Sequence, residues 1–406
     1  MPQESNTFRC IYCGREKPAV ARSYEHIWPD TFGGGASPDW FKTNDCCGEP
    51  RKPKQCNHLM GQFVDAEVAR TPFGTKWRLS AEMPFLDTER PQALPLVFMG
   101  CQTENPSADE ICENWLGSRG EAVYCIHRID RDDFKTYAGG DPIRRKMNDP
   151  GRVYFGLTKL NAYWLLVAVL SVKKKFPGAE IRLLTAVDDP QIAQLLSPET
   201  SQSIAERHYL LPRWRKQTQH LNQTWNLDYG NRFLCKLAVG FGHAFFGPAF
   251  AERPHERTLR EGLWRRPGNS TEPLRIKGKA FFEPGDSGLS KLLTNAAAFT
   301  LVFSRTPEGA WVSTFMPDGI FASCMILPAS EMLPSDFFKT FTDCFTVLLY
   351  PALNQFVGPL PLQAYIEHRT GARTVQALGE IEQRQKTISQ IEAEVAKFNI
   401  AGSEAA

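Results

Sequence analysis

Five of the eleven cysteines lie in the segment from Cys10 to Cys56, at spacings typical of a metal site. A Cys-x-x-Cys pair followed by glycine opens the set, and an adjacent pair and a fifth cysteine follow downstream. Four thiolates can close a tetrahedral site around one Zn²⁺ ion. We predict a structural zinc site with the ligands Cys10, Cys13, Cys47 and Cys56. The spacing of the cysteines does not decide whether Cys46 or Cys47 is the third zinc ligand, and Cys47 is favoured only weakly. The alternatives are metal-free reduced thiols, or a thioredoxin-like redox pair, for which the flanking strand and helix are not indicated.

A second group of side chains has the types needed for hydrolysis. Glu25 and His26 stand side by side shortly before Pro29 and a run of three glycines, and Asn57 and Asp65 follow the last cysteine of the cluster. Carboxylate and amide oxygens suit an Mg²⁺-like ion. A histidine with a pKa near about 6.5 can take a proton from water at neutral pH. Hydrolysis of a phosphodiester requires both a nucleophile and a cation near the leaving oxygen, and this set of residue types can supply them.

The motifs come in a fixed order: Cys-x-x-Cys-Gly, then Glu-His-x-x-Pro with a Gly-Gly turn, then Cys-Asn, then a glycine and an aspartate. In order, spacing and residue type, the N-terminal segment up to about Arg70 resembles the HNH (His-Asn-His) endonuclease family, in its zinc-knuckle subgroup. The resemblance covers under a fifth of the chain. It implies a ββα-metal fold, a hairpin plus a helix, which is too small for a sizeable core, so that zinc would hold it together.

The resemblance also implies roles for individual residues. His26 corresponds to the general base, Glu25 to the acidic ligand of a catalytic divalent ion such as Mg²⁺, and Asn57 to a second ligand at the start of the helix. Asp65 either ligates this ion or orients a ligand. The alternative for His26 is a histidine packed in the knuckle. Because adjacent residues of a strand point to opposite faces, Glu25 and His26 can serve one site only if the strand twists or ends there, and Pro29 favours an ending.

A basic and aromatic stretch lies farther along the chain. Residues 206–266 hold 11 Lys and Arg against 5 acids, with tryptophans and a tyrosine interleaved. Such a stretch suits phosphate contacts and base stacking. The alternative is a solvated helix face with core tryptophans. The candidate nucleic-acid contacts are Arg213, Arg215, Lys216, Arg260 and Arg265.

Composition is that of an ordinary globular protein, with 42% hydrophobic and 23% charged residues, which excludes collagen-like and wholly disordered chains. The net charge of +2 predicts neither a nucleic-acid nor a membrane partner. The chain lacks a secretory start, and its longest apolar run, Tyr163 to Val172, is shorter than the ~18–20 residues of a membrane span. We therefore expect no membrane partner, and a cytoplasmic location with reduced cysteines.

The length of 406 residues predicts two or three domains. Periodicity predicts an α+β fold with three parts: a nuclease module over residues 1–85, a recognition or regulatory α+β domain over 86–368, and a C-terminal helix over 369–406. Further elements are expected as follows: a connector at 71–95, strands at 96–101, 122–129 and 181–187, helices at 157–175 and 231–246, and a hairpin at 311–326.

The C-terminal segment carries a short heptad seam. Ile381, Ile388 and Val395 are seven residues apart, and so are Ile391 and Phe398. This spacing favours either a terminal helix packed on its own domain or a dimerising coiled coil. A homodimer through this helix is therefore an expectation.

Taken together, the sequence predicts a metal-dependent HNH endonuclease acting on double-stranded DNA, with structural Zn²⁺ and catalytic Mg²⁺ or another divalent cation. Bacterial restriction or anti-phage defence is the expected setting. The alternatives are a zinc-dependent nucleic-acid-binding protein without cleavage activity, and an effector nuclease activated by a small ligand.

Overall fold

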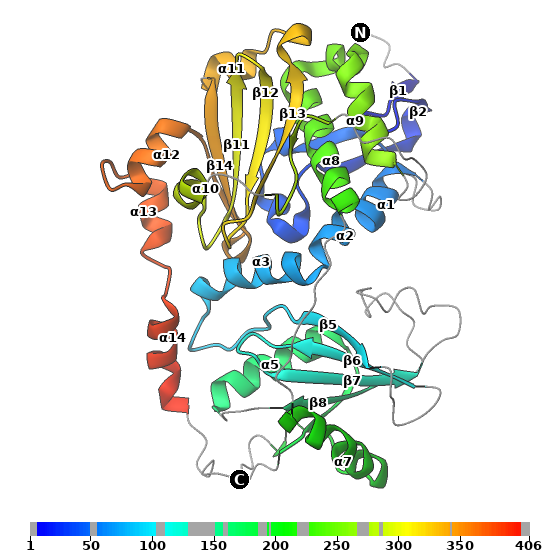
Figure 1. Cartoon of the computed structure of the whole chain (residues 1–406), viewed down its shortest axis with the longest axis vertical. Coiled ribbons are helices and arrows are strands. Elements are labelled where there is room, and N and C mark those ends of the chain that lie inside the picture. Colours follow the sequence, from blue (N-terminus) through cyan, green and yellow to red (C-terminus); the bar gives the residue numbers. More distant parts are fainter. Residues whose placement is uncertain are drawn as a thin grey trace. The chain divides into compact units, whose positions relative to one another are not determined.

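Figure 1 shows the protein as a computed structural model, coloured along the sequence. The structure describes residues 6–48, 55–102, 110–128, 151–156, 161–185, 193–194, 196–216, 227–265, 276–283, 287–341 and 343–398. The chain forms two compact units: unit 1 contains Met1–Ala69 and Trp225–Gln385, and unit 2 contains Arg70–Thr224 and Lys386–Ala406. This division differs from the expected boundaries after residues 85 and 368, because the N-terminal segment shares its core with the second half of the chain.

The N-terminal segment of unit 1 consists of two small pairs of strands followed by a helical stretch. Its elements are β1 Thr7–Arg9, β2 Glu16–Pro18, β3 Arg22–His26, β4 Lys42–Cys47, α1 Cys56–Met60, the π-helical turn η5 Gly61–Asp65 and α2 Ala66–Ala69. Strand β1 pairs antiparallel with β2, and β3 pairs antiparallel with β4. Strands β3 and β4 and helix α1 thus follow the strand, strand, helix order that the resemblance implies.

The rest of unit 1 is built on a six-stranded antiparallel sheet. Its strands are β10 Gly278–Lys279, β11 Phe299–Thr306, β12 Gly309–Phe315, β13 Phe321–Pro328, β14 Cys344–Tyr350 and β15 Gln355–Pro361, in the order β10-β13-β12-β11-β14-β15. The helices of this part are α8 Leu227–Phe246, α9 Pro254–Trp264, α10 Ser287–Leu293, α11 Asp336–Phe341, α12 Leu362–Arg369 and α13 Gln376–Glu382. The hairpin predicted over residues 311–326 is confirmed as β12 and β13.

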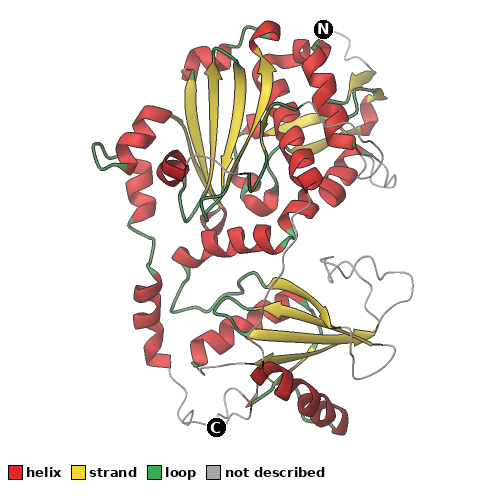
Figure 2. Cartoon of the chain, in the orientation of Figure 1, coloured by secondary structure: helices red, strands yellow, loops and turns green. Residues whose placement is uncertain are grey.

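Helix α8 is the centre of unit 1, and it packs against β13 (Figure 2). The sequence predicts one apolar face, but the helix is buried on nearly all sides, and even Arg232 and Lys236 are buried. Aromatic side chains of the N-terminal segment complete this core. The ring of Trp28 lies 5.7 Å from those of Phe233 and Phe299, measured between centroids. The small N-terminal module therefore obtains its apolar core from α8 and the sheet.

Unit 2 is a five-stranded sheet with helices on both faces. Its elements are α3 Pro72–Glu82, β5 Val97–Gln102, β6 Glu110–Leu116, β7 Ala122–Arg128, β8 Arg152–Gly156, α5 Ala162–Lys175, β9 Glu180–Leu183, α7 Ser201–Lys216 and α14 Ile388–Val395. The strands lie in the order β5-β6-β7-β8-β9, and only β8 and β9 are parallel. Helix α5 covers one face, with Val169 buried against Phe155 and Trp115, and Leu210 of α7 is buried on the other. Helices and sheets in both units make the chain α+β, as predicted.

A buried charged group, which we call the arginine cluster, lies on the α7 side of this sheet. Arg152 donates to Glu206 at 2.8 Å and to Glu110 at 2.6 Å. Glu206 also accepts hydrogen bonds from Tyr154 and Gln202. The single cation is thus shared between two carboxylates, and one of these carboxylates accepts from three side chains.

Two expectations from the sequence differ from the structure. The stretch after Thr71, expected as a connector, begins with helix α3, because Pro72 is tolerated in a first turn and the Thr71 side chain accepts from the backbone of Gly74. The C-terminal segment is helical as expected, but it is divided into α13 and α14. A capping box formed by Thr387 and Gln390 starts the second helix.

The heptad seam of this segment is therefore not one continuous surface. Ile381 is buried in unit 1, and Ile391 and Val395 are buried in unit 2 against Tyr163 and other apolar side chains. Ile388 remains 60% exposed. Packing within the chain thus takes up most of the residues that a coiled-coil dimer would need.

Among the described residues, one helical stretch, Leu227–Glu252, is long and apolar enough to cross a membrane, and it exceeds the run that the sequence analysis singled out. In the structure, 72% of its most apolar window is buried inside the protein. This burial is the behaviour of a core helix.

Candidate active site

Four cysteines come together at the N-terminal segment. The sulfur atoms of Cys10, Cys13, Cys47 and Cys56 all lie within 4.8 Å of one another. The turn at Cys10 is closed by hydrogen bonds from Gly14 N to Cys10 O and from Cys10 N to Arg15 O. Strand β4 and the start of α1 supply the other two sulfurs. Among the described residues, this is the one group of three or more metal-binding side chains that meets at such distances.

The cluster fits a zinc ion in size and in chemistry. Sulfur atoms about 2.3 Å from a tetrahedral zinc lie just under ~4 Å apart, which is compatible with the observed limit. A hydrogen bond with Cys13 raises the pKa of Cys10 to about 11, and the same contact lowers the pKa of Cys13. The thiols thus share protons, and a dication would allow all four to become thiolates.

The structure distinguishes the adjacent pair of cysteines that the sequence left open. Both lie on strand β4, where successive side chains point to opposite faces. Cys47 joins the cluster, and the Cys46 side chain is buried outside this group, with its sulfur 3.8 Å from the carbonyl oxygen of Cys47. The loop before Cys56 lies outside the described residues at positions 49–54.

Strand β3 ends at His26 and presents its last two side chains to different surroundings. Glu25 is buried, with 8% of the residue exposed, whereas His26 is only partly buried. The ring of His26 lies on the same side as the exposed ring of Tyr24, at 5.0 Å and nearly perpendicular to it. Burial lowers the pKa of His26. Its imidazole is therefore neutral at neutral pH and partly accessible, which a general base requires.

Asn57 ties the start of α1 to the same strand. Its side-chain nitrogen donates to Ser23 Oγ at 2.6 Å and to the carbonyl oxygen of Tyr24 at 2.7 Å. Both hydrogens of the amide are thus used to hold β3. The carbonyl oxygen of Asn57 is the atom of this side chain that can serve as a metal ligand.

Glu25 and Asp65 meet through a lysine that the sequence analysis did not assign to the site. The ammonium of Lys236, on α8, lies 2.8 Å from Glu25 Oε1 and 2.7 Å from Asp65 Oδ2. We call these three residues the lysine cluster. Burial alone would lower the pKa of Lys236, but the charges of Asp65 and Glu25 raise it to about 12. Burial raises the pKa of Asp65 to about 6 despite the opposing effect of Lys236.

These contacts decide how well the predicted ligands fit a catalytic divalent ion. Lys236 occupies one oxygen of Glu25 and one of Asp65, and the other oxygen of Asp65 is buried without a hydrogen bond. The second oxygen of Glu25 and the carbonyl oxygen of Asn57 fit the role of ligands. Asp65 contacts Lys236 through its other oxygen, Oδ2.

A lone lysine in an apolar helix is a signal that could have revealed this contact. Lys236 stands between Cys235 and Leu237 in a run of buried residues, and a fully buried lysine almost always has a charged partner. By its position in the chain it belongs instead to the basic stretch. Its partner Asp65 is 171 residues away, so spacing could not identify the pair.

The five candidate nucleic-acid contacts are divided between the two units. Arg213, Arg215 and Lys216 are on α7 in unit 2, and Arg260 and Arg265 are at α9 in unit 1. Arg213 lies over the ring of Tyr209, and Arg215 is exposed. The side chain of Lys216 lies outside the described residues.

Arg260 has a structural role at the zinc knuckle. Its Nε lies 2.7 Å from the buried Glu256, and its guanidinium covers Gly14, where an added Cβ would lie 1.4 Å from a guanidinium nitrogen. Gly14 also has a φ of +67°, which favours glycine. Nearby, Trp264 donates to the carbonyl oxygen of Tyr12 at 2.7 Å. These residues of the basic stretch therefore secure the knuckle to α9.

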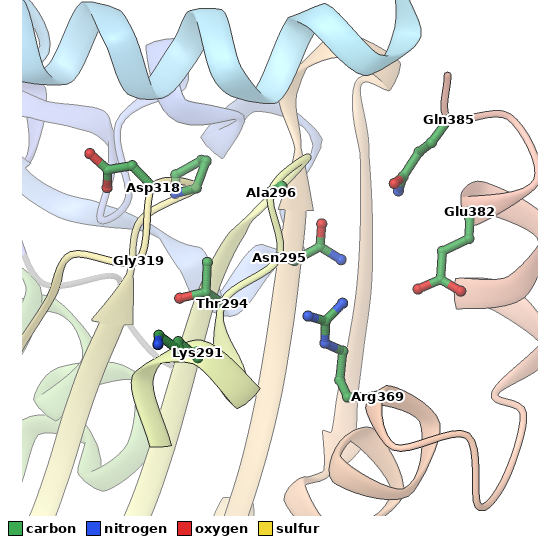
Figure 3. A pocket seen from close by; sticks show the side chains of 10 residues that line it. Lys291, Thr294, Asn295, Ala296, Asp318, Gly319, Arg369, Glu382 and Gln385 are labelled. Carbon is green, nitrogen blue, oxygen red and sulfur yellow. The ribbon is translucent and has the colours of Figure 1, made fainter. Parts of the chain in front are cut away.

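A separate cleft of about 380 Å³ lies in unit 1, between the start of β11 and α13. Figure 3 shows Arg369 and Asn295 on one side and Glu382 and Gln385 on the other. Lys291 and Asp318 also line it, so that two cations and two carboxylates are present and charge alone selects no ligand. The cleft contains none of the predicted site residues.

The comparisons with known proteins agree with the geometry of the N-terminal segment. Residues 10–73 match the family model HNH_5, described as HNH endonuclease. This match identifies an HNH endonuclease domain over these residues, which supports a nuclease and nucleic-acid binding. No curated protein matches the chain. No solved structure matches it either.

Proposed function

We propose that the protein is a metal-dependent endonuclease that hydrolyses phosphodiester bonds of DNA. The observation that supports this most is the position of His26. It is the last residue of β3, partly accessible, with a lowered pKa, and Asn57 is hydrogen-bonded to the same strand. A neutral imidazole held at a strand end can accept a proton from an attacking water molecule.

The other residues of the site complete the proposed chemistry. Glu25 and Asn57 would hold a divalent cation, with Mg²⁺ as the natural candidate for oxygen ligands. When bound, the ion supplies positive charge at the leaving oxygen. Lys42 stands opposite His26 in the β3–β4 ladder and offers a positive charge for a phosphate beside the base.

Zinc is the proposed structural ion of the cluster Cys10, Cys13, Cys47 and Cys56. The cluster joins the turn after β1, the end of β4 and the start of α1. One ion therefore connects the strand pair to the helix that carries Asn57.

The test is cleavage of supercoiled plasmid by the full chain with Mg²⁺ or Mn²⁺. His26→Ala should lower the rate by roughly 10²- to 10⁴-fold, as expected for loss of a general base. His208→Ala, which removes an exposed histidine of α7, is the matched control and should cleave like wild type. Full cleavage by His26→Ala would remove His26 from the role of base.

The same assay separates the alternative functions. If the plasmid stays intact with every metal while a gel shift detects binding, the protein is a nucleic-acid-binding module without cleavage, or it needs an activating ligand. Single-stranded DNA and RNA in parallel reactions define the substrate preference.

A bacterial restriction or anti-phage role in the cytoplasm is the proposed setting. One HNH site cuts one strand at a time, so a double-strand break needs two encounters or a dimer. Because Ile391 and Val395 are buried within the chain, we do not place a dimer interface on the C-terminal seam.

A further inference from the structure

Lys236 lies outside the segment that matches the HNH endonuclease model, yet it contacts two of its acids. We propose that Lys236 is a positioning residue of the nuclease site, which holds Glu25 so that the second oxygen of this carboxylate faces the divalent ion. Asp65 holds the lysine in turn. This inference rests on the proposed function, and it extends the active site from the matched N-terminal segment to helix α8.

The lysine is supported by a rigid surrounding. None of its side chain is exposed, and the neighbouring residues Phe233 and Leu237 are fully buried. Helix α8 also approaches the end of β3 closely. A Cβ added at Gly240 would lie 2.5 Å from the side chain of Ile27, the residue after His26. The ammonium therefore cannot move without disturbing the core, and it sets where Glu25 Oε1 lies.

Charge favours the same role. The two carboxylates of the lysine cluster and one ammonium carry a net charge of −1 when ionised, which remains favourable for a cation. Without the lysine, Glu25 and Asp65 would face each other as like charges with a gap between them, and such pairs repel strongly when buried. Lys236 thus bridges the two carboxylates and contacts one oxygen of each.

Lys236 contacts only part of the two carboxylates. It reaches Glu25 Oε1 and Asp65 Oδ2, and Asp65 Oδ1 is buried without a hydrogen bond. Partners that orient a metal ligand typically change metal affinity or activity by about 10- to 100-fold when mutated.

The test compares Mn²⁺ binding and cleavage by the full chain and by Lys236→Met, which keeps the unbranched shape of the side chain, is one atom shorter and removes its charge. Free Mn²⁺ is followed by electron paramagnetic resonance without substrate. We expect Mn²⁺ binding to weaken by about 10-fold or more and kcat at saturating Mn²⁺ to fall by about 10- to 100-fold, with unchanged zinc content. Lys339→Met, which removes an exposed lysine paired with Asp336, is the control and should match wild type.

Asp65→Asn and the double variant, which combines Asp65→Asn with Lys236→Met, complete a double-mutant cycle with wild type and Lys236→Met. If Asp65 acts through the lysine, the double variant should be no slower than Lys236→Met alone. A merely structural role would lower thermal stability without a selective change in Mn²⁺ affinity. Should Lys236→Met fail to fold, Asp65→Asn carries the test, because it keeps the shape of the side chain.

Several outcomes would overturn the proposal. The first is that folded Lys236→Met has the Mn²⁺ affinity and kcat of wild type; if this variant does not fold, the same result in Asp65→Asn counts instead. The second is that Lys236→Met binds Mn²⁺ more tightly than wild type, which would identify the ammonium as a competitor of the ion. The proposal would also be overturned if wild type showed no detectable Mn²⁺ binding, or if Glu25→Gln left Mn²⁺ binding unchanged. If wild type binds Mn²⁺ at Glu25 but cleaves no substrate, the proposed function fails and the Mn²⁺ titrations still decide this inference.

Discussion

Each unit of the protein buries a cation between two carboxylates, but the two clusters differ in the side chains that donate to the acids. In the arginine cluster of unit 2, Glu206 accepts from three side chains, and the guanidinium reaches both acids. In the lysine cluster of unit 1, the ammonium reaches one oxygen of each acid. One oxygen in each cluster, Glu110 Oε2 and Asp65 Oδ1, is buried without a hydrogen bond. The comparison suggests that the cluster with additional hydroxyl and amide donors serves stability and that the lysine cluster serves a ligand.

The largest expected effect follows from removing the zinc site, which holds the N-terminal segment of unit 1 together, whereas unit 2 has its own apolar core. Cys56→Ser removes one of the four sulfurs that join β4 to α1, and structural zinc sites supply about 10–16 kcal/mol in small peptides. We expect loss of bound zinc and loss of hydrogen-exchange protection in residues 6–69, while the sheet of unit 2 keeps its protection. Metal analysis and hydrogen-exchange mass spectrometry measure both.

Cys46→Ser is the matched control, because Cys46 lies next to the cluster on the same strand but outside it. It should retain one zinc per chain. Equal loss of protection in both units after Cys56→Ser would contradict the view that unit 2 stands on its own core.

The second effect tests the arginine cluster. Arg152→Met leaves two buried carboxylates without their cation, and breaking such a pair costs about 3–5 kcal/mol of unfolding free energy. Denaturant unfolding of the full chain measures this cost. Mn²⁺ affinity should stay at the wild-type value, in contrast to Lys236→Met, and a shift in Mn²⁺ affinity would erase the distinction between the clusters.

The third effect is the pH dependence of cleavage. Burial lowers the pKa of His26, outweighing the opposite effects of Asp30 and Glu25, while Lys42 and Lys236 also lower it. A base with a lowered pKa stays neutral as the pH falls, so the acid limb of kcat/KM should have its midpoint below about 6.5. Below that midpoint the rate should fall about tenfold per pH unit. Any residual activity of His26→Ala should lack this limb, and a midpoint above about 7 would contradict the assignment.

The smallest effect is expected on the surface of the same module. Arg22 and Asp45 form an ion pair at 3.5 Å, and about half of each side chain is exposed. Exposed pairs contribute about 0–1 kcal/mol. Arg22→Ala should change the unfolding free energy by less than about 1 kcal/mol and leave zinc content unchanged, and a larger loss would mean that charge on this surface matters as much as the buried clusters.

Local patterns in the sequence predict the knuckle and much of the secondary structure. The hairpin of β12 and β13 and the helix α8 follow from alternation and from helical spacing. The capping box at Thr387 could also be recognised in the sequence, but the seven-residue spacing of Ile381, Ile388 and Val395 drew attention to a continuous seam instead. Heptad spacing therefore did not reveal that the helix stops between two of its members.

The parts that could not be predicted depend on contacts between distant residues. The choice of Cys47 over Cys46 depends on which face of β4 turns toward Cys10, and the role of Asp65 depends on a lysine on α8. The contacts of the basic stretch could not be read from the sequence for the same reason. Charge counts do not show that Arg260 covers Gly14 or that Lys236 is buried.

The discontinuous course of unit 1 has a consequence for the order of events during synthesis. The segment that carries His26 leaves the ribosome long before helix α8, since Asp65 and Lys236 are 171 residues apart. At about 5–20 residues per second, this distance corresponds to a delay of roughly 10–35 s. During this time the segment Met1–Ala69 has neither the aromatic core nor the lysine of the finished unit. A chain interrupted before Lys236 would therefore lack part of the proposed nuclease site, and the proposal thus links cleavage to completion of unit 1.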